Sequence, residues 1–195
     1  MNIKYLGYYL TPEGLQMDPA KVKVIQDWLE PQNVRDIQSF LSLANFYQWF
    51  IRNYSEFVVP LTQLTHKDAP WNFTEDCHST FNMLKHVFTS ALVLTHWVPD
   101  TQLIVEINAS NYALGAILPL VTDDGQIHPL TFHSWTFLLG ELNYDTHDKE
   151  LLTIYEAFWT WRHYLENSTL PIDIVTDHKN LTYFVTSMVL IHQQA

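Results

Sequence analysis

The chain has 195 residues, of which 47% are hydrophobic, and its 10 Lys and Arg against 21 Asp and Glu give a formal net charge of −11. This length and composition exclude a disordered chain and allow one globular domain with a smaller one appended. The acidic balance argues against strong unaided binding to nucleic acid, because Lys and Arg are the residues that neutralise phosphates.

Cysteine usage and the N-terminus bear on the compartment. Cys77 is the only cysteine, which excludes an intramolecular disulfide and a multi-cysteine zinc site and suits a reducing compartment. Its place on a predicted helix face favours a buried apolar residue over a nucleophile. Residues 1–10 are too polar and too short for a signal peptide, and no apolar run is long enough to span a membrane. We therefore expect a soluble intracellular protein, cytoplasmic or nuclear and not secreted.

The first third of the sequence predicts short amphipathic helices. Asp18, placed before a proline, opens a helix that ends before Pro31, Asn33 caps a second helix, and Ser55 begins a third. Their apolar faces, in order, are Val22, Ile25 and Leu29, then Ile37, Phe40, Leu41 and Ala44, then Val58, Leu61 and Leu64. Residues 18–66 are therefore predicted to form a small helical subdomain.

A polar, proline-containing stretch at residues 66–72 is the predicted linker. After it, Thr74 caps a further helix. The apolar side chains on one face of that helix are Cys77, Phe81, Leu84 and Phe88. Residues 67–90 are therefore predicted to be a linker and a tether helix.

From residue 91 the pattern changes from helices to strands. Alternating apolar and polar side chains predict a strand at residues 103–109, followed by an apolar strand at 113–121. An Asp-Asp-Gly turn then leads into a strand at residues 127–133. A long amphipathic helix is predicted at 146–165, and a parallel strand at 172–176 follows it.

Several residue groups carry a resemblance to a known family. The downstream groups are Asn143-Tyr144-Asp145-Thr146-His147-Asp148-Lys149-Glu150-Leu151-Leu152, Trp161-Arg162-His163-Tyr164-Leu165 and Thr176-Asp177-His178-Lys179-Asn180-Leu181. In this order and spacing they resemble the ribonuclease H domain of gypsy-type LTR-retrotransposon Pol polyproteins. The upstream groups Tyr5-Leu6-Gly7-Tyr8, Pro12-Glu13-Gly14, Met17-Asp18-Pro19 and Leu43-Ala44-Asn45-Phe46-Tyr47 resemble the segment that follows the polymerase active site there. The resemblance covers essentially the whole chain.

The resemblance implies an α/β fold in four parts. Residues 1–17 would be the C-terminal edge of a reverse transcriptase palm, 18–66 a helical thumb-like subdomain, 67–90 a linker and tether helix, and 91–195 a ribonuclease H-like mixed-sheet domain lacking its last helix. Residues 18–66 suit a small bundle without a ligand equally well. Because the sequence has no Tyr-x-Asp-Asp tetrapeptide, no polymerase activity is expected from this chain alone. It ends before the family's last metal-binding acid, so we expect an internal piece of a larger polyprotein.

The resemblance also implies a site for two magnesium ions. Ribonuclease H enzymes cut the RNA strand of an RNA/DNA hybrid with two ions, and such hard cations prefer anionic oxygen ligands. By motif, Glu150 and Asp177 take the second and third acidic positions, while Asn108 takes the first. Asn offers one neutral carbonyl oxygen where an anionic oxygen should bridge both ions. We therefore expect a weak or empty magnesium site and at most residual ribonuclease H activity.

The same acidic residues, and three histidines, also have purely structural explanations. The negative charge of Glu150, in the first turns of a helix, interacts favourably with the helix dipole. Asp177, at a strand end, can cap the next helix. Zinc binding by His147, His163 and His178 is disfavoured, because none has a Cys or His partner at ligand spacing. These histidines are therefore expected to be solvated or capping residues.

Other aromatic and polar residues suggest a loss of nucleic-acid contacts. One aromatic series fits a helix core better than a base-stacking platform: Tyr155, Phe158, Trp159 and Trp161. The family resemblance leads us to expect basic residues at two places where this chain has Gln48-Trp49 and Ser134-Trp135-Thr136. Each replacement removes positive charge from a surface expected to meet phosphates.

Three interpretations of the whole chain follow. The first is a retrotransposon-derived reverse transcriptase/ribonuclease H fragment, ancestrally active in RNA-directed DNA synthesis and hybrid cleavage but inactive here. Its expected partners are an RNA/DNA hybrid or primer-template, bound weakly, and the remainder of the Pol polyprotein. The second is a host-retained, non-catalytic binding or scaffold module. The third is an active nuclease with an altered metal set, which a cleavage assay on an RNA/DNA hybrid would reveal.

Overall fold

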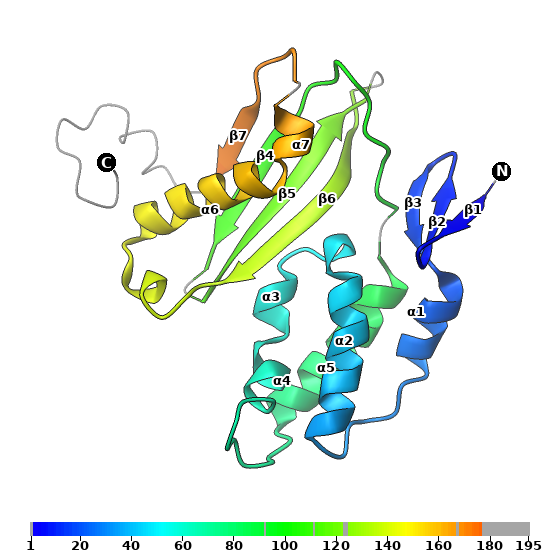
Figure 1. Cartoon of the computed structure of the whole chain (residues 1–195), viewed down its shortest axis with the longest axis vertical. Coiled ribbons are helices and arrows are strands. Elements are labelled where there is room, and N and C mark those ends of the chain that lie inside the picture. The colour runs from blue at the N-terminus through cyan, green and yellow to red at the C-terminus, as the bar shows by residue number, and fades with distance from the viewer. Residues whose placement is uncertain (1, 92, 111, 123–124, 167, 177–195) are drawn as a thin grey trace.

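The computed structural model describes residues 2–91, 93–110, 112–122, 125–166 and 168–176, which form two lobes (Figure 1). A small sheet and a group of helices make up the helical lobe, from β1 to α5. A larger sheet crossed by α6 makes up the sheet lobe, from β4 to β7. The predicted α/β class, with a helical subdomain followed by a mixed sheet, is confirmed. Within the described ranges, no helix has the length and apolarity needed to cross a membrane.

A three-stranded antiparallel sheet opens the chain. Its strands, paired in the order β1-β2-β3, are β1 (Ile3–Tyr5), β2 (Tyr8–Thr11) and β3 (Gly14–Met17). Gly14 has φ 145°, and a Cβ built on it would lie 2.1 Å from the carbonyl oxygen of Leu94. Only glycine fits there, because Leu15 and Leu94 exchange backbone hydrogen bonds of 2.7 and 3.0 Å beside it. This bridge ties the small sheet to the segment that leads into the sheet lobe.

The helical lobe follows the predicted capping and apolar patterns. Its helices are α1 (Pro19–Gln26), α2 (Val34–Phe46), η1 (Gln48–Phe50), α3 (Tyr54–Phe57), α4 (Val59–Gln63) and α5 (Glu75–Thr89). Asn33 caps α2 as predicted, since its Oδ1 accepts a bond of 3.1 Å from the amide of Asp36. The buried side chains of α2 and α5 are those predicted, Cys77 among them.

Three predicted details of these helices were wrong. The first helix ends at Gln26, and Leu29 is 84% exposed; Trp28 packs against Phe40 instead, with ring centroids 5.7 Å apart. The third helix is two short helices, because Pro60 supplies no amide hydrogen with which to continue α3. Thr74 stands at the N-terminus of α5 but makes no side-chain capping bond, since its hydroxyl donates to Cys77 Sγ.

The sheet lobe contains a four-stranded sheet in the order β6-β5-β4-β7. Its strands are β4 (Ile104–Ala109), β5 (Ala113–Val121), β6 (Ile127–Thr136) and β7 (Asp173–Thr176). As predicted, β7 runs parallel to β4, whereas β4, β5 and β6 pair antiparallel. β6 is longer than predicted, because its pairing with β5 continues to Thr136, opposite Ala113. Ser134-Trp135-Thr136 therefore belongs to the strand itself.

Helices cross one face of this sheet. After η2 (Glu141–Asn143), α6 (Thr146–Thr160) runs over the sheet and α7 (Arg162–Leu165) follows (Figure 1). The single helix predicted at 146–165 is therefore interrupted at Trp161, whose side chain is 1% exposed and packs in the core between α6 and the sheet. Leu165, the last residue of α7, is also buried in that core.

The aromatic series of α6 divides between core and solvent. Trp161 is buried and Phe158 packs partly against the core, as predicted. The core interpretation is wrong for Tyr155 and Trp159, which are 60% and 63% exposed. Because only one side of α6 meets the sheet, residues on the other side face solvent, where these two rings stack with centroids 6.5 Å apart.

Candidate functional site

Glu150 lies in the second turn of α6 and is 2% exposed. Its Oε2 accepts a hydrogen bond of 3.2 Å from Thr176 Oγ1, at the end of β7. The structure thus places this predicted site residue against the strand that precedes Asp177. Asp177 itself lies outside the described residues, so its assignment to the site stays a prediction.

Asn108 lies near the end of β4, on the face that α6 does not cover. Val105 and Ile107 belong to the core beneath α6. Side chains alternate along a strand, so Asn108 points to the opposite face. There it lines a hollow of about 160 Å³ together with Asn53 and Glu56 of the helical lobe. Asn108 therefore meets the helical lobe, whereas Glu150 meets β7.

The positions of Glu150 and Asn108 show whether their side-chain oxygens suit a site for two magnesium ions. A two-ion site needs several anionic oxygens converging on ions roughly 3.5–4 Å apart. Among the residues that the structure describes, Glu150 is the one carboxylate of the predicted set, and Asn108 is a neutral amide on the other face of the sheet. Within the described residues, these two donors alone do not supply the anionic oxygens that a two-ion site needs.

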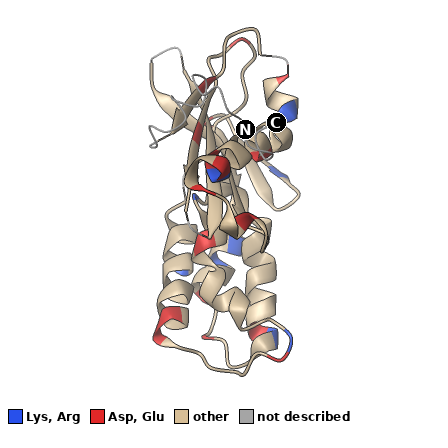
Figure 2. Cartoon of the chain, turned by 90° about the vertical axis from the view of Figure 1, so that its left-hand side faces the viewer, with Lys and Arg blue, Asp and Glu red and all other residues tan. Residues whose placement is uncertain are grey.

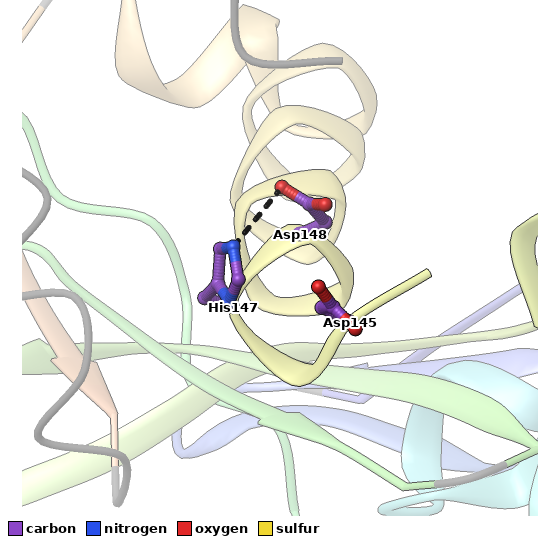
Figure 3. Close-up of side chains that lie close together, drawn as sticks. All are labelled: Asp145, His147 and Asp148. Atoms are coloured by element: carbon purple, nitrogen blue, oxygen red, sulfur yellow. Dashed lines mark ion pairs between the residues drawn. The ribbon is translucent and has the colours of Figure 1, made fainter. Parts of the chain in front are cut away.

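A different cluster of possible ligands stands at the start of α6 (Figure 3). The donor atoms of Asp145, His147 and Asp148 all lie within 4.8 Å of one another, and His147 Nε2 is 3.7 Å from Asp148 Oδ1. Imidazole and carboxylate donors suit a borderline divalent cation. However, the positive end of the α6 helix dipole lies at this cluster and disfavours a bound cation. The prediction from sequence considered only Cys and His as partners of His147, and it therefore missed the Asp-x-His-Asp pattern.

The other two histidines do not extend this cluster. His163 is exposed, and its ring lies against Tyr164, with centroids 4.1 Å apart. In the described part of the chain, the group at Asp145 is the only set of three or more acidic, His or Cys donors close enough to hold an ion. His178 lies outside the described residues.

The surface offers few cations to a phosphate backbone. Figure 2 shows the Lys and Arg residues of the described part scattered over both lobes rather than gathered along one groove. Trp49 and Trp135, at the two places where basic residues were expected, are 39% and 41% exposed. Both positions therefore present indole rings to solvent, where a positive charge would attract phosphates.

Comparisons with known proteins agree with this fold. A family model described as "RNase H-like domain found in reverse transcriptase" matches residues 73–172, about half of the chain. The Tf2-3 and Tf2-4 transposon polyproteins of Schizosaccharomyces pombe (strain 972 / ATCC 24843) are each 31% identical over 186 residues, or 95% of this chain. The chain spans 14% of the length of these relatives.

Solved structures show the same arrangement of elements. A foamy viral protease-reverse transcriptase in complex with dsDNA matches 96% of this chain and 39% of its own, with 22% identity and a TM-score of 0.77. The complex of that enzyme type with an RNA/DNA hybrid matches 99% of this chain and 27% of its own, with 21% identity and a TM-score of 0.74. At this identity the likeness supports the fold alone.

The fold and the matching family model define the class of protein. The chain belongs to the family of RNase H-like domains found in reverse transcriptases. Its similarity to transposon polyproteins over nearly the whole sequence confirms the predicted resemblance to a retrotransposon Pol polyprotein.

Proposed function

We propose that this chain is a catalytically silent segment of a retrotransposon reverse transcriptase/ribonuclease H, with a thumb-like helical lobe and a ribonuclease H-like sheet lobe. One observation carries the proposal. Asn108, a neutral amide, occupies the position at which the resemblance implies an acid that bridges both ions. Ancestrally, such a segment would have served RNA-directed DNA synthesis and cleavage of the RNA strand of a hybrid.

The charge of the donor set supports the loss of activity. Two divalent ions close together repel each other, and a shared carboxylate offsets that repulsion. Replacing it with an amide removes one negative charge from between them, and each 1.36 kcal/mol lost from transition-state stabilisation slows the reaction about tenfold. A loss of several such increments leaves at most residual cleavage.

The proposed nucleic-acid partner is a duplex that the chain binds weakly. The foamy viral structures that share its fold are complexes with dsDNA and with an RNA/DNA hybrid. In this chain the net charge of −11 and the exposed Trp49 and Trp135 oppose phosphate binding. We infer that the family's partner class is kept while the affinity is largely lost.

A cleavage assay tests the proposal. The purified chain is incubated with a labelled RNA/DNA hybrid and magnesium, beside the matched variants Glu150→Gln and Asn108→Asp. The expected result is a trace of cleavage at most, with no difference between the unchanged chain and Glu150→Gln. Robust cleavage that disappears in Glu150→Gln would overturn the proposal. A gain of cleavage in Asn108→Asp would support the assignment of residue 108 to the ancestral site.

A second function, a host-retained binding or scaffold module, is favoured by the packing of the molecule. Both lobes keep a hydrophobic core although the donor set is degenerate. Selection for a fold without catalysis predicts an excess of synonymous over amino-acid-changing differences among orthologous copies. Equal rates of the two kinds of change would argue against a retained host function.

A further inference from the structure

One short segment of the helical lobe contacts three adjacent strands of the sheet lobe. This segment, Arg52–Ser55, precedes and begins α3, and we call it the latch. The Arg52 guanidinium donates to Glu106 Oε1 on β4 at 2.5 Å. The Ser55 amide donates to Ser134 Oγ on β6 at 2.9 Å, and that hydroxyl donates in turn to Ser55 Oγ at 3.0 Å. The latch is thus fixed at both of its ends.

The middle of the latch lies on the strand between these two. Asn53 has φ 55°, a left-handed conformation that Asn tolerates better than most residues. Its Oδ1 approaches Gly115 on β5 so closely that a Cβ at that position would lie only 2.2 Å away. The absence of a side chain at residue 115 therefore lets the latch lie flat on the sheet.

The latch lies directly beside the predicted metal-site position on β4. Gly115 is the register partner of Asn108 across the antiparallel pair. Asn53 and Glu56 form the wall that faces Asn108 in the hollow of about 160 Å³. A ligand that reached residue 108 through this hollow would therefore have to pass beside Asn53 of the latch and Glu56.

We propose that the latch is an occluding contact, which closes the face of the sheet lobe that carries Asn108 and opens only when the two lobes separate. The Arg52–Glu106 ion pair of the latch contributes little stability, since the two side chains are 52% and 37% exposed and solvent screens their charges. Such contacts favour a closed state without making it permanent, so that face should be reached through a minor open population. The proposal does not depend on catalysis, because it concerns access alone.

Thiol labelling measures this access in the full chain. Asn108→Cys places a reporter behind the latch, and Tyr112→Cys places one at a residue that is 63% exposed. The native Cys77 is 3% exposed and gives the background in the unchanged chain. We expect a maleimide to react with Cys at position 108 at least about tenfold more slowly than at position 112, because the closed latch leaves residue 108 only partly exposed at the bottom of the hollow.

Two variants should open the latch. Glu106→Gln removes the charge that holds Arg52, and Gly115→Ala places a methyl group where Asn53 Oδ1 lies. Each should raise the labelling rate at position 108 by about fivefold or more and leave position 112 unchanged. The matched control is Glu166→Gln, which breaks the 2.5 Å ion pair with Arg162 far from the latch and should change neither rate.

Two labelling results would contradict the latch. Equal labelling at positions 108 and 112 in the otherwise unchanged chain would overturn the proposal, as would a rate at position 108 that neither opening variant alters. If Asn108→Cys does not fold, hydrogen exchange at the Ser55 amide replaces it. Exchange there should be slow in the unchanged chain and faster in Ser134→Ala, which removes the acceptor. Equally fast exchange in both chains would contradict a closed latch.

Discussion

Asp18 is a single residue that joins two elements, because it caps the start of α1 and also pairs with a side chain of β1. Its Oδ1 accepts a bond of 2.9 Å from the amide of Ala20 at the start of α1, and its Oδ2 lies 2.6 Å from Lys4 Nζ on β1. The side chain is 3% exposed. Its hydrogen bond to Lys4, aided by the bond from Ala20, holds the pKa of the Asp18 carboxyl below its ordinary value of 3.8.

This pKa shift predicts how Asp18→Asn behaves with pH. A carboxyl with a lowered folded-state pKa stabilises the fold above its unfolded-state pKa, and that stability is lost as the pH falls through the folded-state value. Above about pH 4 we expect Asp18→Asn to melt at a lower temperature than the unchanged chain. The gap should narrow as the pH falls further.

Thermal melts across this pH range provide the test. Asp27→Asn serves as the control, because Asp27 pairs with Lys23 at 3.2 Å on the surface, where the carboxylate is 62% exposed. That variant should lose little stability at any pH. Equal losses in the two variants would show that the Lys4 contact adds nothing specific to Asp18.

At the scale of elements, local pattern determined much of what could be predicted. The cap and apolar face of α2, the apolar face of α5 and the extent of β5 match expectation, because each depends on residues within one segment. The ends of α1 and α6 did not follow from pattern. Trp28, two residues after α1 ends, packs against a core built from distant residues, and Trp161, directly after α6 ends, is buried in another.

The cap of α2 gives a prediction at this scale. Asn33→Ala removes the bond to the Asp36 amide and should cost about 1 kcal/mol of unfolding free energy, measured by urea denaturation. Thr74→Ala is the contrast, since Thr74 makes no capping bond and should cost clearly less. A larger loss in Thr74→Ala than in Asn33→Ala would contradict this account of helix capping.

For the whole molecule, contacts between distant segments decide what the candidate site can do. The sequence identified Asn108 and Glu150 through motif resemblance, but it could not show that the two face different surroundings. Arg52 and Glu106 are 54 positions apart, and Ser55 and Ser134 are 79 apart. Such pairings leave no periodic trace in either segment, so the latch was not predictable.

The charge of the whole molecule predicts its affinity for nucleic acid. With a net charge of −11, the chain should bind an RNA/DNA duplex more weakly than about 100 µM at 0.15 M salt. Fluorescence anisotropy with a labelled duplex measures this directly. Any binding seen at low salt should vanish as salt is added. Micromolar binding that persists at 0.15 M salt would reveal a basic surface that this account lacks.

The most direct measurement is a crystal of this chain soaked in manganese and examined by anomalous scattering. Manganese stands in for magnesium and is visible in such data. Because residue 108 offers a neutral oxygen on the face away from Glu150, no pair of peaks should occur beside it. Two peaks about 3.5–4 Å apart, joined through Asn108, would contradict the central claim that this site has lost its metal ions.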